Sequence, residues 1–160
     1  MNSRFTAALL TAAALVLTAC NGSTSTAPPA PPNVSGDYTG SFQDAQMGSG
    51  NVTGTLAQHG NSAGGAMTMP VAGGTVNFQM SLALSPNNSM GGSIVVDQPN
   101  NGPVCTFSTT ATYDPTNNVI TGTYTAVSNC AGDTGSYTLN QQCVDTVTSV
   151  GRRTMGLHKC

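Results

Sequence analysis

Very few side chains of this 160-residue chain could carry out acid–base or nucleophilic chemistry. The imidazoles are His59, in a Gly- and Asn-rich stretch, and His158, near the C-terminus. We expect each to be a solvated loop or tail residue. Asp114 and Asp133 could form a carboxylate pair for acid–base catalysis, but they fall in turns at opposite ends of the expected fold. Sequences typical of serine hydrolases, zinc proteases and nucleotide-binding loops are absent. We therefore predict no catalytic residue and a protein that is not an enzyme.

Metal ligation has equally little support. Residues 114–118 offer oxygen ligands that calcium could use, but without an acidic run they are better interpreted as a hairpin turn. Several methionines could suggest copper, yet three of them alternate into the expected core, where Met fills gaps. The methionines considered are Met47, Met67, Met69, Met80 and Met90. We expect no metal and no cofactor.

Composition excludes further classes of protein. Four basic residues against six acidic ones leave no cationic surface for phosphate, so nucleic-acid binding is not expected. Every acidic residue is Asp, and the lack of Glu argues against helix bundles and coiled coils. The many Thr, Val and Gly residues instead indicate a β protein with a neutral, hydroxyl-covered surface.

The N-terminus predicts export. Arg4 precedes an unbroken apolar run at 7–16, followed by small residues, which is typical of a secretory signal. Leu17-Thr18-Ala19-Cys20 resembles the lipobox of bacterial lipoproteins. That resemblance implies cleavage before Cys20 and diacylation of its thiol, and Asn21 then favours the outer membrane over the inner one. The alternatives are an ordinary secretory signal with an incidental Cys, or an uncleaved anchor helix.

Four segments are expected along the chain. They are a signal peptide (1–19), a lipidated Cys with a Ser/Thr/Pro-rich tether (20–35), a β-barrel domain (36–143) and a C-terminal tail (144–160). The tail carries Arg152, Arg153 and Lys159, the three basic residues that remain after signal cleavage. We interpret it as a loosely ordered terminus that the barrel does not need; the alternative is a basic arm that contacts anionic lipid or polysaccharide.

The fold prediction rests on apolar residues that recur at every second position, as they do in a half-buried strand. Eight segments show this pattern between turn-forming residues: 36–44, 51–58, 65–71, 75–84, 90–97, 105–113, 120–126 and 135–142. The short links favour an eight-stranded antiparallel up-and-down β-barrel, because closure buries the apolar faces and removes exposed edges. A two-sheet β-sandwich is the alternative.

A repeated sequence motif places Gly two residues before a large apolar side chain, where we expect the glycine to mark a bend in the barrel wall. It occurs at Gly36-Asp37-Tyr38, Gly54-Thr55-Leu56, Gly122-Thr123-Tyr124 and Gly135-Ser136-Tyr137. The pattern resembles small bacterial lipoproteins that contain domains of unknown function. It is also similar, more distantly, to the lipocalin and avidin class of eight-stranded barrels.

Four cysteines remain if Cys20 is lipidated, and an exported protein favours disulfides. If a turn at 114–118 joins two strands, Cys105 lies opposite about residue 127, close to Cys130. Cys143 follows a further strand, roughly 26 Å away at ~3.3 Å per residue. A disulfide needs Cα atoms within about 7 Å. We therefore predict the pairs Cys105–Cys130 and Cys143–Cys160.

Three classes of function remain open. The first is a lipid-anchored, non-catalytic module that binds a small apolar ligand in the barrel. The second is an interaction, inhibitor or surface lipoprotein that contacts an envelope protein through its loops, and an enzyme is the third. The candidate ligand-binding side chains are the interior aromatics Tyr38, Phe42, Phe78, Phe107, Tyr124 and Tyr137. A lumen filled completely by these rings would argue against the ligand.

Overall fold

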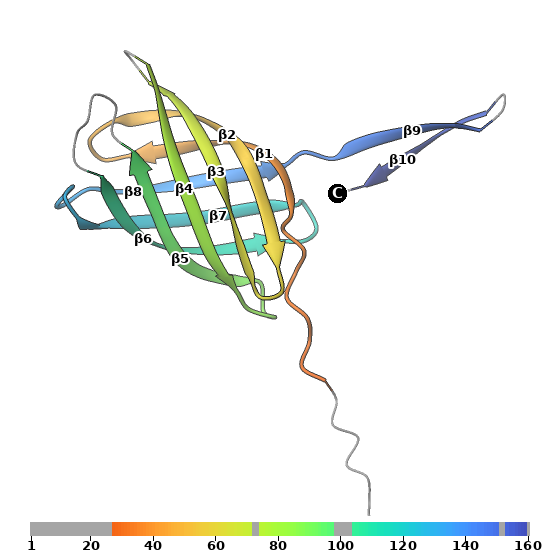
Figure 1. Ribbon diagram of the computed structural model, residues 1–160, viewed down its shortest axis with the longest axis horizontal. Helices are drawn as coiled ribbons and strands as arrows, with labels where there is room; N and C mark the ends of the chain where they lie inside the picture. Colours follow the sequence, from red (N-terminus) through yellow and green to blue (C-terminus); the bar gives the residue numbers. More distant parts are fainter. Residues whose placement is uncertain (1–26, 72–73, 98–103, 151–152, 160) are drawn as a thin grey trace, which may run out of the picture.

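Eight antiparallel strands close into an up-and-down barrel (Figure 1). The computed structural model describes residues 27–71, 74–97, 104–150 and 153–159. The barrel strands are β1 (Gly36–Asp44), β2 (Gly48–His59), β3 (Ser62–Val71), β4 (Gly74–Leu84), β5 (Ser89–Asp97), β6 (Cys105–Asp114), β7 (Val119–Ser128) and β8 (Thr134–Gln141). Each strand pairs with its neighbours in sequence, and β8 pairs with β1. The predicted barrel is confirmed, and the sandwich alternative is wrong.

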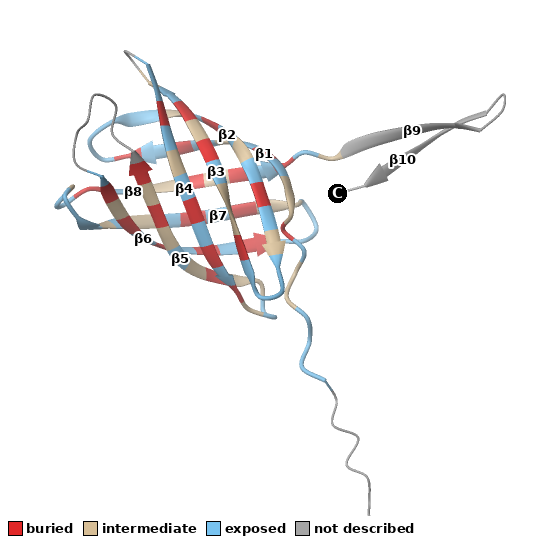
Figure 2. Ribbon diagram, in the orientation of Figure 1, coloured by how far each residue is buried: buried red, intermediate tan, exposed pale blue. Residues whose placement is uncertain are grey.

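The strands alternate buried and exposed positions, so that one face of each lines the interior (Figure 2). In β6, for example, Cys105, Phe107 and Tyr113 are buried, while Ser108 and Thr112 face solvent. Strand register preserves this alternation around the barrel, because residues paired across a ladder point to the same face. Phe42 of β1, for instance, pairs with Tyr137 of β8. Closure at β1–β8 therefore completes both the hydrogen-bond ladder and the apolar core.

One end of the barrel is plugged by the segment that enters β1. Val34 is completely buried there. Its carbonyl accepts a hydrogen bond of 2.8 Å from the Tyr38 hydroxyl, and its amide donates to Gln58 Oε1 at 2.8 Å. Gln141 Nε2 adds a bond of 2.6 Å to the Ser35 carbonyl. Val34, which we had placed in the tether, thus packs against the barrel and covers this end.

Two glycines of the repeated sequence motif have a role that we did not predict. Gly122 of β7 pairs with Tyr137 of β8, and Tyr124 pairs with Gly135. A Cβ added at Gly122 would meet the Tyr137 ring, and a Cβ added at Gly135 would meet the Tyr124 ring. Each glycine therefore leaves space for the ring on the opposite strand, in addition to any bend it allows.

The disulfide Cys105–Cys130 joins the start of β6 to the β7–β8 loop, with Cα atoms 5.6 Å apart. This pairing confirms the prediction from strand order. Cys143 is disulfide-bonded as well. Its predicted partner, Cys160, lies outside the described residues, so the Cys143–Cys160 pair stays a prediction.

The C-terminal segment forms β9 (Val144–Val150) and β10 (Arg153–Lys159), an antiparallel hairpin that shares no ladder with the barrel. We had expected a loosely ordered terminus without strands here. The Val and Thr residues of 144–150 favour extended backbone. No helix among the described residues has the length and apolar character needed to cross a membrane.

Candidate functional site

A partly open cavity of about 50 Å³ occupies the barrel interior at the end opposite Val34. We call it the cup. It lies at the end of the barrel that contains the β1–β2 turn, the start of β6 and the end of β7. Apart from Asp44, its lining consists of aliphatic, Met and aromatic side chains. The non-aromatic apolar residues of the wall are Met47, Val52, Met69, Met80, Ile94, Val96 and Leu139.

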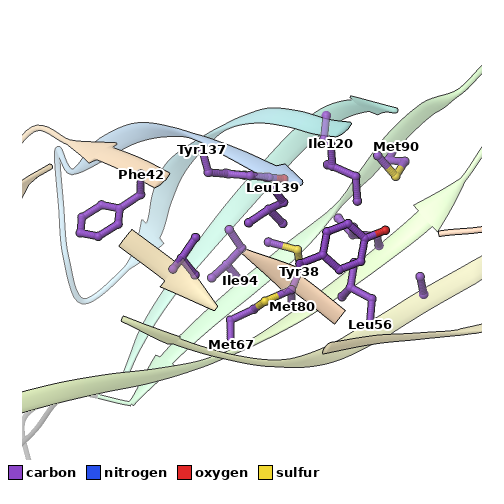
Figure 3. Packing of buried hydrophobic residues seen from close by; sticks show 14 of the residues in the cluster. Tyr38, Phe42, Leu56, Met67, Met80, Met90, Ile94, Ile120, Tyr137 and Leu139 are labelled. Carbon is purple, nitrogen blue, oxygen red and sulfur yellow. The ribbon is translucent and has the colours of Figure 1, made fainter. Parts of the chain in front are cut away.

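Five of the six predicted aromatic residues line the cup: Phe42, Phe78, Phe107, Tyr124 and Tyr137. The sixth, Tyr38, is 1% exposed and its hydroxyl donates a hydrogen bond to the Val34 carbonyl at the plugged end, so it lies in the barrel interior but does not line the cup. Figure 3 shows this separation, with Phe42 and Tyr38 toward opposite ends of the cluster. The difference arises because Tyr38 lies six residues before Asp44 on β1, far from the open end.

Aromatic rings narrow the cup without filling it. The Phe107 and Tyr124 rings meet edge to face, with centroids 5.3 Å apart, and Tyr124 stacks near Tyr137 at 6.4 Å. The Tyr137 hydroxyl shares a buried hydrogen bond of 2.9 Å with Thr109 Oγ1. Burial raises the pKa of Tyr137 above its ordinary value, so its hydroxyl is a neutral partner in this bond.

Asp44 supplies the carboxyl group on the cup wall. It is 5% exposed. Its Oδ1 accepts backbone hydrogen bonds from Gln46 and Met47 at 2.8 and 2.7 Å, which fixes the β1–β2 turn. Its Oδ2 accepts a bond of 2.7 Å from the Tyr124 hydroxyl. Three donors are thus directed at one carboxyl group, and they hold it in place on the cup wall.

Asp133, in the β7–β8 loop, interacts with Asp44 and is 4% exposed. Burial, followed by the repulsion from Asp44, raises the pKa of Asp133 above its ordinary value of 3.8. A hydrogen bond between the two side chains acts in the same direction. Oδ1 of Asp133 is buried without a hydrogen-bond partner. Burial and the neighbouring Asp44 carboxyl group thus both disfavour the charged form of Asp133.

This pair was missed from the sequence. We had weighed Asp133 against Asp114, and the structure does place those two residues in turns at opposite ends of the barrel. Asp44 was assigned only to the end of a strand. The missing signal was topological: in a closed meander the β1–β2 and β7–β8 turns lie at the same end, and closure makes β1 and β8 neighbours. The direct contact depends on that closure.

Exposed apolar side chains gather around the same end. Met47 follows β1, Val104 precedes β6, and Val127 lies near the end of β7. They are the large hydrophobic residues that remain exposed among the residues described. Exposed single apolar residues are common on protein surfaces; of these three, Met47 also lines the cup.

The other candidates for chemistry do not come together. His59 is exposed at the end of β2, and His158 lies in β10, whose side chains are outside the described part of the structure. Within that part, no three His, Cys, Asp or Glu residues are grouped as metal ligands. The cup is suited to holding an apolar group. No family model matches this chain, and no curated protein matches it either.

Proposed function

We propose that this protein is an exported, lipid-anchored and non-catalytic binding module whose cup holds a small apolar ligand. The observation that carries the proposal is the cup itself, an apolar cavity that is partly open at one end of the barrel. A barrel that served only as a rigid spacer would have no need of unfilled interior space, because voids destabilise a core.

The volume of the cup limits the ligand. One water molecule needs roughly 10–15 Å³ of such space, so 50 Å³ accommodates about four heavy atoms. Typical drug-sized pockets are about 300–1,000 Å³. The ligand is therefore a compact molecule, or the end of a longer one that projects through the open side.

Chain direction supports an anchored module. The segment that follows the predicted lipobox enters the barrel at the plugged end, beside Val34, while the cup lies at the other end (Figure 1). An anchor attached through residues 20–33 would leave the cup facing away from its attachment point. Lipidation is tested by palmitate labelling of cells that produce the wild type or Cys20→Ala. Label retained in the variant would refute it.

Ligand binding is tested with four-carbon probes that differ in their polar end, titrated into ¹⁵N-labelled protein and followed by ¹H–¹⁵N NMR. Val96→Phe should fill the cup and weaken binding at least tenfold. Val95→Phe is the matched control, because Val95 precedes Val96 on β5 and faces the other side of the sheet. If no probe shifts the amides around the cup in the wild type, the proposed function is wrong.

The three exposed apolar residues at the cup end of the barrel favour a second candidate, an interaction protein that contacts an envelope partner through its loops. Photo-crosslinking residues placed at Met47 and Val127 should then yield a discrete adduct in cells, whereas the same residue at Val95 on the outer wall should not. Equal crosslinking at all three positions would contradict this candidate.

A further inference from the structure

We propose that the ligand of the cup is a free amphiphile with an unbranched alkyl chain, whose methyl end enters the cup while its polar head stays outside. This inference rests on the proposed function, because it names the chemical class of the ligand that the cup holds. Three observations carry it: the size of the cup, the hydrogen bonds of the polar side chains on its wall, and the flexible apolar side chains around it.

The size of the cup excludes a ring. An engineered cavity of about 150 Å³ in another protein holds one benzene molecule. The cup has about a third of that volume, 50 Å³. An extended alkyl chain is narrower than a ring, and the terminal four carbon atoms of such a chain match the roughly four heavy atoms that the cup accommodates.

Both hydroxyl groups of the cup wall already donate hydrogen bonds within the protein. The Tyr124 hydroxyl donates to Asp44 Oδ2 at 2.7 Å. The Thr109 hydroxyl donates to the Thr123 carbonyl at 2.8 Å, so in its 2.9 Å bond with Tyr137 it is the acceptor. A ligand oxygen inside the cup would therefore lose its bonds to water and find no free hydroxyl donor among the described residues of the wall. Because an unpaired buried oxygen is costly, the inserted end is the methyl end.

The alkyl chain extends beyond the cup. Four heavy atoms, even at the largest contribution per atom that ligands achieve, give dissociation constants no lower than about tens of micromolar. Met47 lines the cup and is 47% exposed, so it offers apolar contact to carbon atoms that lie outside. With Met69 and Met80, it also gives the wall flexible side chains that adapt to a chain without a fixed shape.

Entry of the methyl end identifies the ligand as a free molecule and not as a lipid within a bilayer. The methyl ends of bilayer lipids meet inside the hydrocarbon core, where the headgroups cover them. A cup that admits the methyl end first can take only a chain that has left the bilayer. Residues 36–143 also contain neither Lys nor Arg, so no basic side chain of the barrel domain is present to bind the phosphate of a membrane lipid.

The test compares three alcohols with eight carbon atoms, titrated into the ¹⁵N-labelled full chain after signal removal and followed by ¹H–¹⁵N NMR. 1-Octanol has one methyl end, 1,8-octanediol has a hydroxyl at each end, and 2-cyclohexylethanol ends in a ring. 1-Octanol should bind at least about tenfold more tightly than either of the others, because the diol buries a hydroxyl without a donor and the ring is too wide. Vesicles of phosphatidylcholine should leave the amides around the cup unshifted.

Phe78→Leu tests which side chain limits the width of the cup. Phe78 lines the cup on β4 and is partly exposed, so leucine should widen the cup at a modest cost in stability. The variant should bind 2-cyclohexylethanol at least about fivefold more tightly than the wild type does. Leu56→Val is the matched control: it also removes core volume, but at the plugged end, where Leu56 pairs with Gly36. It should leave the order of the three alcohols unchanged.

The outcomes separate the two proposals. Tighter binding of 1-octanol than of both other alcohols supports the amphiphile, and this comparison in the wild type does not depend on the variants. Equal binding of the diol or of the ring overturns the amphiphile and leaves the apolar cup intact, whereas binding of none of the alcohols overturns the proposed function itself. Vesicles that shift the same amides overturn the assignment to a free molecule. A folded Phe78→Leu variant that binds the ring no more tightly contradicts the role of Phe78.

Discussion

Removing the Tyr124 hydroxyl isolates the contribution of the hydrogen bond that it donates to Asp44. The bond is 2.7 Å long and its acceptor is a buried carboxyl group. Hydrogen bonds to charged groups contribute about 1.5–3 kcal/mol to stability, and neutral ones about 0.5–1.5 kcal/mol. Tyr124→Phe keeps the ring that packs edge to face on Phe107. We therefore expect it to lower the free energy of unfolding by about 2 kcal/mol.

Tyr113→Phe provides the matched control. The Tyr113 hydroxyl lies 3.0 Å from Asn118 Oδ1 and 3.3 Å from Gln141 Oε1, both neutral amide oxygens. Its removal should cost about 1 kcal/mol, the usual amount for a neutral bond. The two substitutions remove the same atom from the same residue type in one barrel. The difference between their losses of unfolding free energy therefore measures how much the charge of the acceptor adds to the hydrogen bond.

The assay is urea unfolding of the full chain after signal removal, at pH 7, followed by circular dichroism and linear extrapolation. A double-mutant cycle with Asp44→Asn should give a coupling energy of at least about 1 kcal/mol with Tyr124→Phe, since residues in contact couple by 0.5–3 kcal/mol. If Tyr124→Phe costs no more than Tyr113→Phe and the coupling is absent, the hydrogen bond to Asp44 contributes no more than a bond to a neutral acceptor, and the reasoning is refuted.

Four further outcomes are expected. The folded-state pKa of Asp133 lies above its ordinary value of 3.8, so the unfolded chain loses this proton at a lower pH than the folded one. The contribution of Asp133 to the free energy of unfolding should therefore be fully present below pH 3.8. It should fall, by at most about 1.4 kcal/mol per pH unit, as pH rises through the folded-state pKa. Asp133→Asn should abolish that fall in urea titrations, and an unchanged slope would contradict it. Gly122→Ala should destabilise by about 1–3 kcal/mol through overpacking, whereas Gly91→Ala, whose added Cβ would meet nothing closer than 3.9 Å, should change stability by less than about 1 kcal/mol in the same assay. Cys130→Ser should cost about 3 kcal/mol by opening a 25-residue loop, and a loss below 1 kcal/mol would show that the unfolded chain is already constrained there. Truncation after Gln142 should leave one cooperative thermal transition within a few degrees of the wild type, because the C-terminal hairpin shares no ladder with the barrel; loss of that transition would place the tail in the core.

Local chemistry made the strands predictable. Each barrel strand has apolar residues at alternate positions and ends at residues that favour turns, and the chain forms strands at all eight of these places. Asn88 and Asn118, for example, adopt positive φ values of 65° and 56° in such turns, which Asn tolerates better than most residues. The tail lacks a comparable pattern, and its two strands were not predicted.

The candidate site was predictable only in part. Alternation along the strands predicted that Phe42, Phe78, Phe107 and Tyr137 point into the barrel; their location at the open end is a finding of the structure. Alternation along a strand determines which face of the sheet a side chain occupies, but it does not determine how far along the barrel axis the side chain lies. Tyr38 shares the inward face with Phe42 and yet lies at the plugged end.

The sequence by itself determined the class of fold, the strand order and the Cys105–Cys130 disulfide. The fold class and strand order follow from the alternation of apolar residues and from the turn residues, which are local properties of the chain. The disulfide follows from that strand order and the distance along the chain. Only the tertiary structure decided that Asp44 meets Asp133, that Val34 closes one end and that space remains at the other. The physical reason is closure of β1 against β8: it brings together residues nearly 90 positions apart, and the fit of side chains inside a closed wall depends on all eight strands at once. The volume left in the cup is a property of that packing.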